Sequence, residues 1–255
     1  MIKIVGGVLV NKFILVVLAM MLCSSAFCAD ISVIKELAEQ GNAPAQYLLG
    51  YAYYSGTDYK EAVNWYRKAA EQGHADAQTN LGNAYLNGEG VPQDYKEAVN
   101  WYCKAAEQGH AVAQFTLARA YLNGKGVPQD YKEAVKWLQK AAEQGLAGAQ
   151  AALGFCYYDG EGVAQDKAEA VNWYRKAAEK GDVDAQAALG SCYYIGEGVS
   201  QNYAEAYFWQ NLAASQNADF AKFRDEVAAK LTPGKIEEVQ ARCKKWLGDF
   251  EKRKR

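Results

Sequence analysis

The sequence lacks a large excess of either charge, which limits the kinds of partner that it can bind. Lysine and arginine number 28 against 30 acidic residues, a net charge of −2. Without residues 1–29 the chain has 26 basic and 30 acidic residues, a net charge of −4. Because nucleic acids are bound mainly through clustered basic side chains, and no basic stripe is present, we expect no nucleic-acid partner.

Motifs for catalysis and metal binding are scarce as well. His74 and His110 follow the same repeated glycine, where Asn42 and Asp182 stand in other copies, so we interpret them as helix N-caps. A zinc site needs further ligands close in sequence, and no Cys or His supplies them. We therefore expect no metal and no cofactor. Glycine pairs such as Gly88/Gly90 lack the Lys-Ser/Thr of a phosphate-binding loop.

One short motif leaves an enzyme as an alternative. Ser32 and Lys35 fit the S-x-x-K of penicillin-recognising serine enzymes. The companion S-D-N and K-T-G elements are absent from the chain, and such a pair arises easily by chance. We therefore predict that the protein is not an enzyme, and keep a hydrolase of cell-wall or β-lactam substrates as the alternative.

Near the N-terminus, residues 13–29 form an apolar run without charge that follows Lys3 and Lys12. Its seventeen residues fall short of the roughly 20 that a membrane span needs, and small residues lie at its end. The run resembles a secretory signal peptide cleaved at about 26–29. We expect a periplasmic or secreted protein, with membrane attachment only if the segment stays uncleaved.

What the sequence does contain is a repeat. Five tryptophans fall 36 residues apart, and long stretches recur around them: Trp65, Trp101, Trp137, Trp173 and Trp209. Five copies span residues 41–216, and the first lacks four loop residues. Such a period is typical of stacked helical repeats. We place the copies at residues 41–72, 73–108, 109–144, 145–180 and 181–216.

Each copy predicts two helices. The first, helix A, has an apolar face at helical spacing (Ala77, Leu81, Ala84, Tyr85) and ends at a glycine. The second, helix B, packs through Ala98, Trp101, Ala105 and Ala106. Its start predicts a capping box, in which the first side chain caps the helix and a Glu three residues later reaches back. The pairs are Asp58/Glu61, Asp94/Glu97, Asp130/Glu133, Asp166/Glu169 and Asn202/Glu205.

The repeated pattern A-x-x-x-L-G-x-x-Y-x-x-G-x-G-V-x-x-D-x-x-x-A-x-x-W-Y-x-K-A-A-x-x-G resembles the Sel1-like repeat, which is related to the tetratricopeptide repeat. Departures are Ala118 for Gly, Leu138 for Tyr and Asn202 for Asp. The resemblance implies an all-α, right-handed α-solenoid of antiparallel helix pairs, and a protein-interaction scaffold. A cysteine-rich branch has disulfides within each repeat, but those cysteine pairs are missing here.

The ends are expected to close the array. Residues 30–40 align with the second half of a helix B and predict an N-terminal capping helix. Residues 217–255 predict two charged capping helices and a solvated basic tail, with Thr232 as N-cap and Pro233 as first helical residue. Cys156 and Cys192 occupy a small position on helix A and are predicted to be buried thiols. The redox states of Cys103 and Cys243 stay open.

The helix A face opposite the core varies most between copies and carries aromatic residues. In the related tetratricopeptide fold this face lines the concave groove, so we predict that it binds a peptide or protein. A competing interpretation is that Tyr158 and Tyr194 pack in seams between helices. The hypothesis is an exported interaction scaffold, with a secreted or envelope-anchored host-interaction factor as the alternative. The candidate residues are Tyr47, Tyr51, Asn83, Phe115, Arg119, Phe155, Tyr158 and Tyr194.

Overall fold

The computed structural model describes residues 26–253, and every regular element within that range is a helix. The predicted all-α class is confirmed. The chain divides into two compact units, residues 1–108 (unit 1) and residues 109–255 (unit 2), which are described separately. Most of the predicted signal peptide, with Lys254 and Arg255 of the basic tail, lies outside the described residues.

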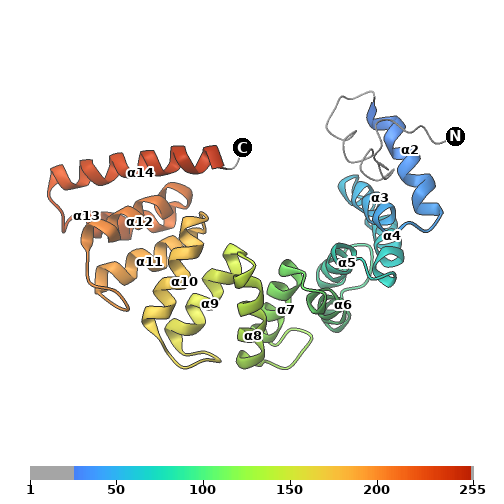
Figure 1. The fold of residues 1–255 in the computed structure, drawn as a ribbon, viewed down its shortest axis with the longest axis horizontal. Coiled ribbons are helices and arrows are strands. Elements are labelled where there is room, and N and C mark those ends of the chain that lie inside the picture. Colours follow the sequence, from blue (N-terminus) through green and yellow to red (C-terminus); the bar gives the residue numbers. More distant parts are fainter. Residues whose placement is uncertain (1–25, 254–255) are drawn as a thin grey trace, which may run out of the picture. The chain divides into compact units, whose positions relative to one another are not determined.

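Unit 1 holds two repeats and the helix before them (Figure 1). Consecutive helices pack on one another, so each helix A lies between two neighbours. The first helix begins at Ala26, earlier than the predicted capping helix 30–40, and it packs on the first repeat through Ile34 and Ala38. The helices are α2 (Ala26–Glu39), α3 (Ala43–Ser55), α4 (Tyr59–Glu71), α5 (Ala75–Asn87) and α6 (Tyr95–Glu107).

Unit 2 holds three further helix pairs and the C-terminal helices. Among these, α14 lies along α12, the last helix B (Figure 1). A 3₁₀ turn (Ala218–Phe220) leads from α12 into α13. The helices are α7 (Ala111–Asn123), α8 (Tyr131–Glu143), α9 (Ala147–Asp159), α10 (Lys167–Glu179), α11 (Val183–Ile195), α12 (Tyr203–Gln216), α13 (Ala221–Ala228) and α14 (Pro233–Arg253). No helix between residues 26 and 253 is long and apolar enough to cross a bilayer.

Half of the predicted capping box is confirmed. The Asp94 carboxylate accepts hydrogen bonds from the Lys96 and Glu97 backbone N–H groups, and the equivalent residue caps every other helix B. The predicted return contact from Glu is wrong. The Asp94 backbone N–H donates instead to the Tyr85 carbonyl near the end of helix A, at 2.9 Å. The same bond recurs in the other repeats, so the cap residue joins the two helices of its pair.

In the first, second and fourth repeats the tyrosine after the tryptophan is a buried ring, and it is less exposed than the tryptophan itself: the residues are Tyr66, Tyr102 and Tyr174. We expected Trp101 on the packed face of α6, but it is half-buried, whereas Tyr102 is 1% exposed. The Lys104 ammonium lies 3.8 Å from the centre of the Trp101 ring and covers its outer side. Tyr102 instead lies against Gly82, where an added Cβ would come within 2.6 Å of the ring. The glycine of helix A therefore leaves the space that the tyrosine ring occupies, and we call this position the glycine seat.

A buried glutamine on helix A connects each pair to its surroundings. The Gln78 amide donates to the Ala70 carbonyl of the preceding helix B, and its Oε1 accepts from Gln108 at the end of its own helix B, at 2.7 Å. We call this arrangement the glutamine relay. Because both polar ends are paired, the side chain is buried at little cost and fixes three helices together. Gln46 and Gln186 make both contacts in the same way, whereas Gln114 accepts from Gln144 and Gln150 donates to the Ala142 carbonyl.

Glycines keep the loops between helices A and B close to the preceding repeat. Gly88 ends α5 in the left-handed region, as predicted, at φ 74°. Gly90 has φ 73°, and a Cβ there would lie 2.2 Å from the Tyr59 carbonyl oxygen at the start of α4. The shortened first repeat differs: Gly56 has φ −82° and Thr57 adopts φ 66°. Removing four residues therefore shifted the left-handed position by one.

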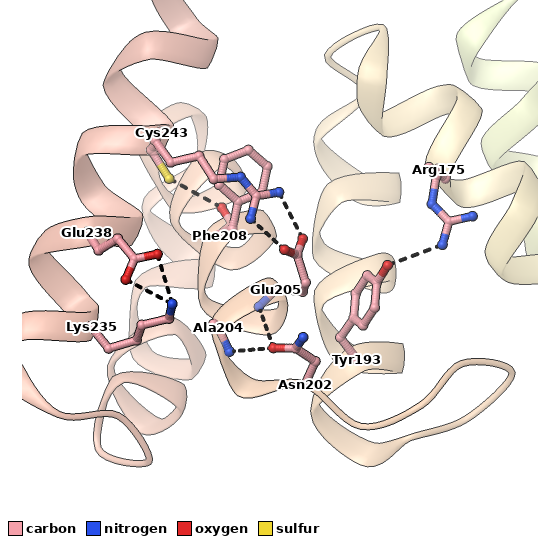
Figure 2. Close-up of polar contacts among 10 residues, drawn as sticks. Arg175, Tyr193, Asn202, Ala204, Glu205, Phe208, Lys235, Glu238 and Cys243 are labelled. Atoms are coloured by element: carbon pink, nitrogen blue, oxygen red, sulfur yellow. Dashed lines mark hydrogen bonds and ion pairs between the residues drawn. The ribbon is translucent and has the colours of Figure 1, made fainter.

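The C-terminal helix is held to the last repeat by charge and packing (Figure 2). Arg242 on α14 forms a bidentate ion pair with Glu205, in which Nη2 lies 2.9 Å from Oε2. The Arg242 guanidinium also lies over the Phe208 ring. Thr232 caps α14, which begins at Pro233 as predicted. Cys243 is buried beside the Phe208 carbonyl. This end of the array is therefore closed by a helix that carries its own charged outer surface.

The two cysteines predicted to be buried thiols are buried and form no disulfide. Cys156 and Cys192 are each 3% exposed. Burial raises the pKa of both thiols to about 11. The equivalent small residue is buried at Ala84, half-buried at Ala120 and exposed at Ala52, so the position is not uniformly closed.

Candidate functional site

The candidate residues of unit 1 divide between an exposed ring and internal contacts. Tyr51 is 55% exposed on the outer face of α3. Tyr47 is half-buried and stacks on the His74 ring with 4.8 Å between ring centres. Asn83 accepts a 2.7 Å hydrogen bond from the Tyr102 hydroxyl, which makes it a partner of the buried ring. Tyr51 is therefore the candidate in unit 1 with most of its surface available to another molecule.

In unit 2 the third repeat presents a cation beside a ring. Arg119 is exposed on α7, and its guanidinium carbon lies 5.8 Å from the centre of the Phe115 ring. Phe115 is half-buried and packs against Gly148 of the next helix A. Because a guanidinium beside a ring keeps its hydrogen-bond donors, Arg119 can still donate to a carboxylate or a carbonyl of a partner.

The fourth repeat presents Phe155, which is 41% exposed on α9. The edge of its ring rests against Tyr174, with 5.0 Å between ring centres. Because Tyr174 is 1% exposed, a buried ring holds Phe155 in place while one face stays in solvent. Such a preordered aromatic ring loses little entropy on binding.

The remaining candidates pack in seams, as the competing interpretation predicted. The Tyr158 hydroxyl donates to Glu197, which also pairs with Lys167 at 2.8 Å. The hydrogen bond to Glu197, together with burial, raises the pKa of Tyr158 to about 12, and Lys167 lowers that of Glu197. Tyr194 lies edge-on to Phe223 of α13, with 5.2 Å between ring centres. Tyr158 therefore connects α9 to the loop after α11, and Tyr194 connects α11 to α13.

The side chains of the fourth and fifth repeats and the C-terminal segment also enclose a pocket of about 320 Å³. Three aromatic residues line it: Phe155 of α9, Phe220 of the 3₁₀ turn and Phe223 of α13. Gln210 of α12, only 1% exposed, lies at the pocket. The other lining residues, all on α11, are Asp184, Ala187, Ala188 and Ser191. Of the eight candidate residues, Phe155 alone lines this pocket.

The sequence reasoning missed most of this pocket. It did not consider Phe220 and Phe223, because they lie in the capping segment outside the repeats. Gln210 was also overlooked, although it stands where the first, second and fourth repeats have Tyr66, Tyr102 and Tyr174. A polar residue in place of a buried ring was the signal that could have revealed it. Among the described residues, no cluster of His, Cys, Asp and Glu has the arrangement of a metal site.

The model of the Sel1 repeat matches residues 43–74, 75–110, 111–146, 147–182 and 183–217. The chain belongs to the Sel1 repeat family. Each matched range begins two residues after the repeat predicted from the sequence. The family assignment agrees with the recognised pattern, including the third repeat with Ala118 and Leu138.

Solved structures support the same assignment. The c5321 protein, a protective antigen of uropathogenic Escherichia coli strains, is 45% identical with a TM-score of 0.71. That match covers 73% of this chain and 41% of the antigen, so this chain spans less than half of its relative. A Sel1 repeat protein from Oxalobacter formigenes is 42% identical with a TM-score of 0.66, covering 69% of this chain and 74% of that one. A search of curated proteins found no match.

Proposed function

We propose that this Sel1 repeat scaffold is exported and binds a protein or peptide on the helix A face opposite the core, which we expect to line a concave groove, without catalytic activity of its own. The observation that carries the proposal is Phe155: an aromatic ring 41% exposed, held by a buried ring and bordering a pocket. Aromatic and arginine side chains supply most binding energy in protein interfaces. Arg119 offers such a group on the neighbouring helix A of the same unit.

The test uses anchors and controls from the two helix types. A photo-crosslinking amino acid at position 155 identifies the partner, and the affinity of that partner is then measured for Tyr51→Ala, Arg119→Ala and Phe155→Ala. Each anchor variant should weaken binding by about 1 kcal/mol or more. Stability should change by about 0.5 kcal/mol or less, because all three residues belong to the exposed class.

Lys68→Ala and Lys104→Ala on helix B serve as controls and should leave the affinity unchanged. These lysines cover Trp65 and Trp101 at 3.9 and 3.8 Å from the ring centres, so melting curves are recorded for every variant. An unchanged affinity in all three anchor variants, or losses that follow unfolding, would reject the helix A face as the binding surface.

Export is tested by the intact mass of the mature protein. Cleavage at about 26–29 should leave a protein that begins between Phe27 and Asp30 in the periplasmic or secreted fraction. Because α2 begins at Ala26, such a cleavage would take away no more than the first turn of that helix. Protein in that fraction that retains residues 1–26 would contradict the proposal and favour an N-terminal membrane anchor.

The relative described as a protective antigen favours a second candidate, a secreted or envelope-anchored factor that binds host proteins. Binding of the mature protein to host-cell extracts, compared with the Phe155→Ala variant, distinguishes it from a partner within the bacterial envelope. For the hydrolase alternative, Ser32 and Lys35 lie on exposed positions of α2. A covalent penicillin adduct on Ser32 would support the hydrolase alternative.

A further inference from the structure

At the pocket, the fifth repeat has smaller side chains at two positions where the fourth repeat has aromatic rings. Ser191 stands where the fourth repeat has Phe155, and Gln210 stands where it has Tyr174. Gly190, the seat of the missing ring, is retained, and an added Cβ there would come 2.8 Å from Cγ of Gln210. The C-terminal segment then adds Phe220 and Phe223 over the space. The result is an aromatic-walled pocket with a polar floor.

The orientation of the Gln210 amide follows from its partners. Nε2 lies 2.8 Å from the Ala187 carbonyl oxygen and 3.4 Å from the Ser191 hydroxyl. A carbonyl oxygen only accepts hydrogen bonds, so the amide nitrogen must face it. Oε1 of Gln210 is then buried and, within the described chain, has no hydrogen-bond partner. A buried acceptor without a partner costs free energy that a ligand donor can recover.

The polar atoms of the pocket that remain for a ligand are acceptors. The Ser191 hydroxyl proton is used in a 3.0 Å bond to the Ala187 carbonyl, and both Gln210 amide protons face acceptors. Asp184 is exposed at the pocket and is the one ionisable residue among the described residues that line it. A ligand that fits this set brings N–H donors and positive charge.

We propose that this pocket receives a lysine or arginine side chain of the partner protein. The aliphatic part of the side chain lies between Phe155 and Phe223, and the cationic group faces the aromatic rings and Asp184. A ligand N–H donates to Oε1 of Gln210, which supplies the missing hydrogen bond. The volume of about 320 Å³ lies at the lower end of ligand pockets, which suits one side chain rather than a cofactor.

This inference rests on the proposed function and adds the chemistry of the partner. Four capped amino acids serve as probes: the N-acetyl amides of arginine, lysine, norleucine and glutamate. Each is titrated into the ¹⁵N-labelled protein, and the amide signals of residues 187–191 and the side-chain amide of Gln210 are followed. Arginine and lysine should shift these signals with dissociation constants in the millimolar range, about tenfold or more tighter than norleucine and glutamate.

Two variants and a matched control locate the site. Gln210→Tyr restores the residue of the fourth repeat on its retained glycine seat, so the protein should stay folded while the ring fills the pocket. The affinity for the arginine probe should fall about tenfold or more. Asp184→Asn should weaken it about threefold or more. Asp159→Asn removes the same charge from an exposed position of α9 outside the pocket and should leave the affinity unchanged.

Three results would overturn the inference. Norleucine that binds as tightly as arginine would make the pocket an apolar site. Undiminished arginine binding in Gln210→Tyr, or in Asp184→Asn, would place the cation elsewhere. An absence of shifts with every probe would show that the pocket takes no such side chain. In each case, a weaker affinity of the crosslinked partner for Phe155→Ala would still support the proposed function.

Discussion

The third and fourth repeats solve the same packing problem with different residues. In the fourth repeat Tyr174 of α10 lies against Gly154 of α9, where an added Cβ would come 2.6 Å from the ring. In the third repeat the corresponding residues are Leu138 and Ala118, both 0% exposed and in one hydrophobic cluster. The smaller side chain on helix B accompanies the extra methyl group on helix A.

The two departures from the repeat pattern are therefore one steric exchange. A glycine on helix A makes room for an aromatic ring, and an alanine requires a narrower side chain opposite it. In these two repeats the sizes of the two residues match each other, and helix propensity does not require that match. We therefore expect the stability of a repeat to be most sensitive to substitutions where the helix B residue meets the helix A glycine or alanine.

The largest effect is expected from Tyr174→Ala in the fourth repeat. The ring is 1% exposed, and its removal should lower the free energy of unfolding by about 3–5 kcal/mol. Trp137→Ala, one repeat earlier, should cost less, because that indole is half-buried with Lys140 over it at 4.1 Å. Denaturant unfolding of both variants measures the order. A greater loss for Trp137→Ala would show that the tryptophans, and not the residues that follow them, contribute most to the core of the repeats.

The second prediction concerns the thiol of the fourth repeat. Because burial raises the Cys156 pKa to about 11, its thiolate population at pH 8 is about 100-fold below that of a thiol with the ordinary pKa of 9.0. Alkylation by iodoacetamide should be slowed at least in that proportion and should accelerate as the pH rises towards 11. Mass spectrometry of timed reactions gives the rate.

The matched control places a thiol at the same position of the third repeat. Ala120 is half-buried where Cys156 is buried, so the thiol of Ala120→Cys should react faster than Cys156 at every pH. Equal rates at the two positions would contradict the difference in burial between the repeats.

The third prediction tests the steric exchange directly. Gly154→Ala adds a Cβ against the Tyr174 ring and should cost about 1–3 kcal/mol. Adding Tyr174→Leu to this variant recreates the pair of the third repeat, so the double variant should lose less than the sum of the two single variants. A double-mutant cycle on unfolding free energies measures the coupling. Additive losses would show that the two positions are independent.

The smallest effect is expected at the end of α10. Gln150 donates to the Ala142 carbonyl, but its Oε1 is buried without a partner in the described chain, because Lys180 stands where other repeats have a relay glutamine. Lys180 donates to the Gly145 carbonyl instead. Lys180→Gln should complete the relay, as Gln144 does for Gln114, and raise stability by about 1 kcal/mol. Lys180→Ala should give no gain, and an equal gain in both variants would contradict the relay.

The repeats themselves were predictable because their signals are local and recur. Helix ends follow from caps such as Asp94 and from glycines such as Gly88, and the order of helices follows from the period. The difference in burial between Trp101 and Tyr102 did not follow, since both are large aromatic residues that lie next to each other at the border of the packed face. Which of them meets Gly82 depends on the crossing of two helices, which one repeat in isolation does not specify.

The candidate site was predictable to a smaller degree. Variation between copies pointed to the face of helix A opposite the core, where Tyr51, Arg119 and Phe155 are exposed, and binding at that face stays a prediction. It did not separate these residues from Asn83, whose side chain accepts from Tyr102. The same variation arises from binding and from internal packing, so the hydrogen-bond partners were needed. The pocket at Gln210 required the position of the C-terminal segment.

The glutamine relay has a consequence for how such a chain can change in length. Gln78 reaches one residue of the preceding helix B and one residue of its own, and no further. A duplication or deletion of one complete period therefore rejoins the same donors and acceptors at the new junction. A change of length in the loop between helices A and B keeps them as well, since Gln72 donates to Gln46 at 2.7 Å in the first repeat, which is four residues shorter. The protein can therefore gain or lose whole repeats, and each repeat brings the aromatic and charged residues of its own helix A face.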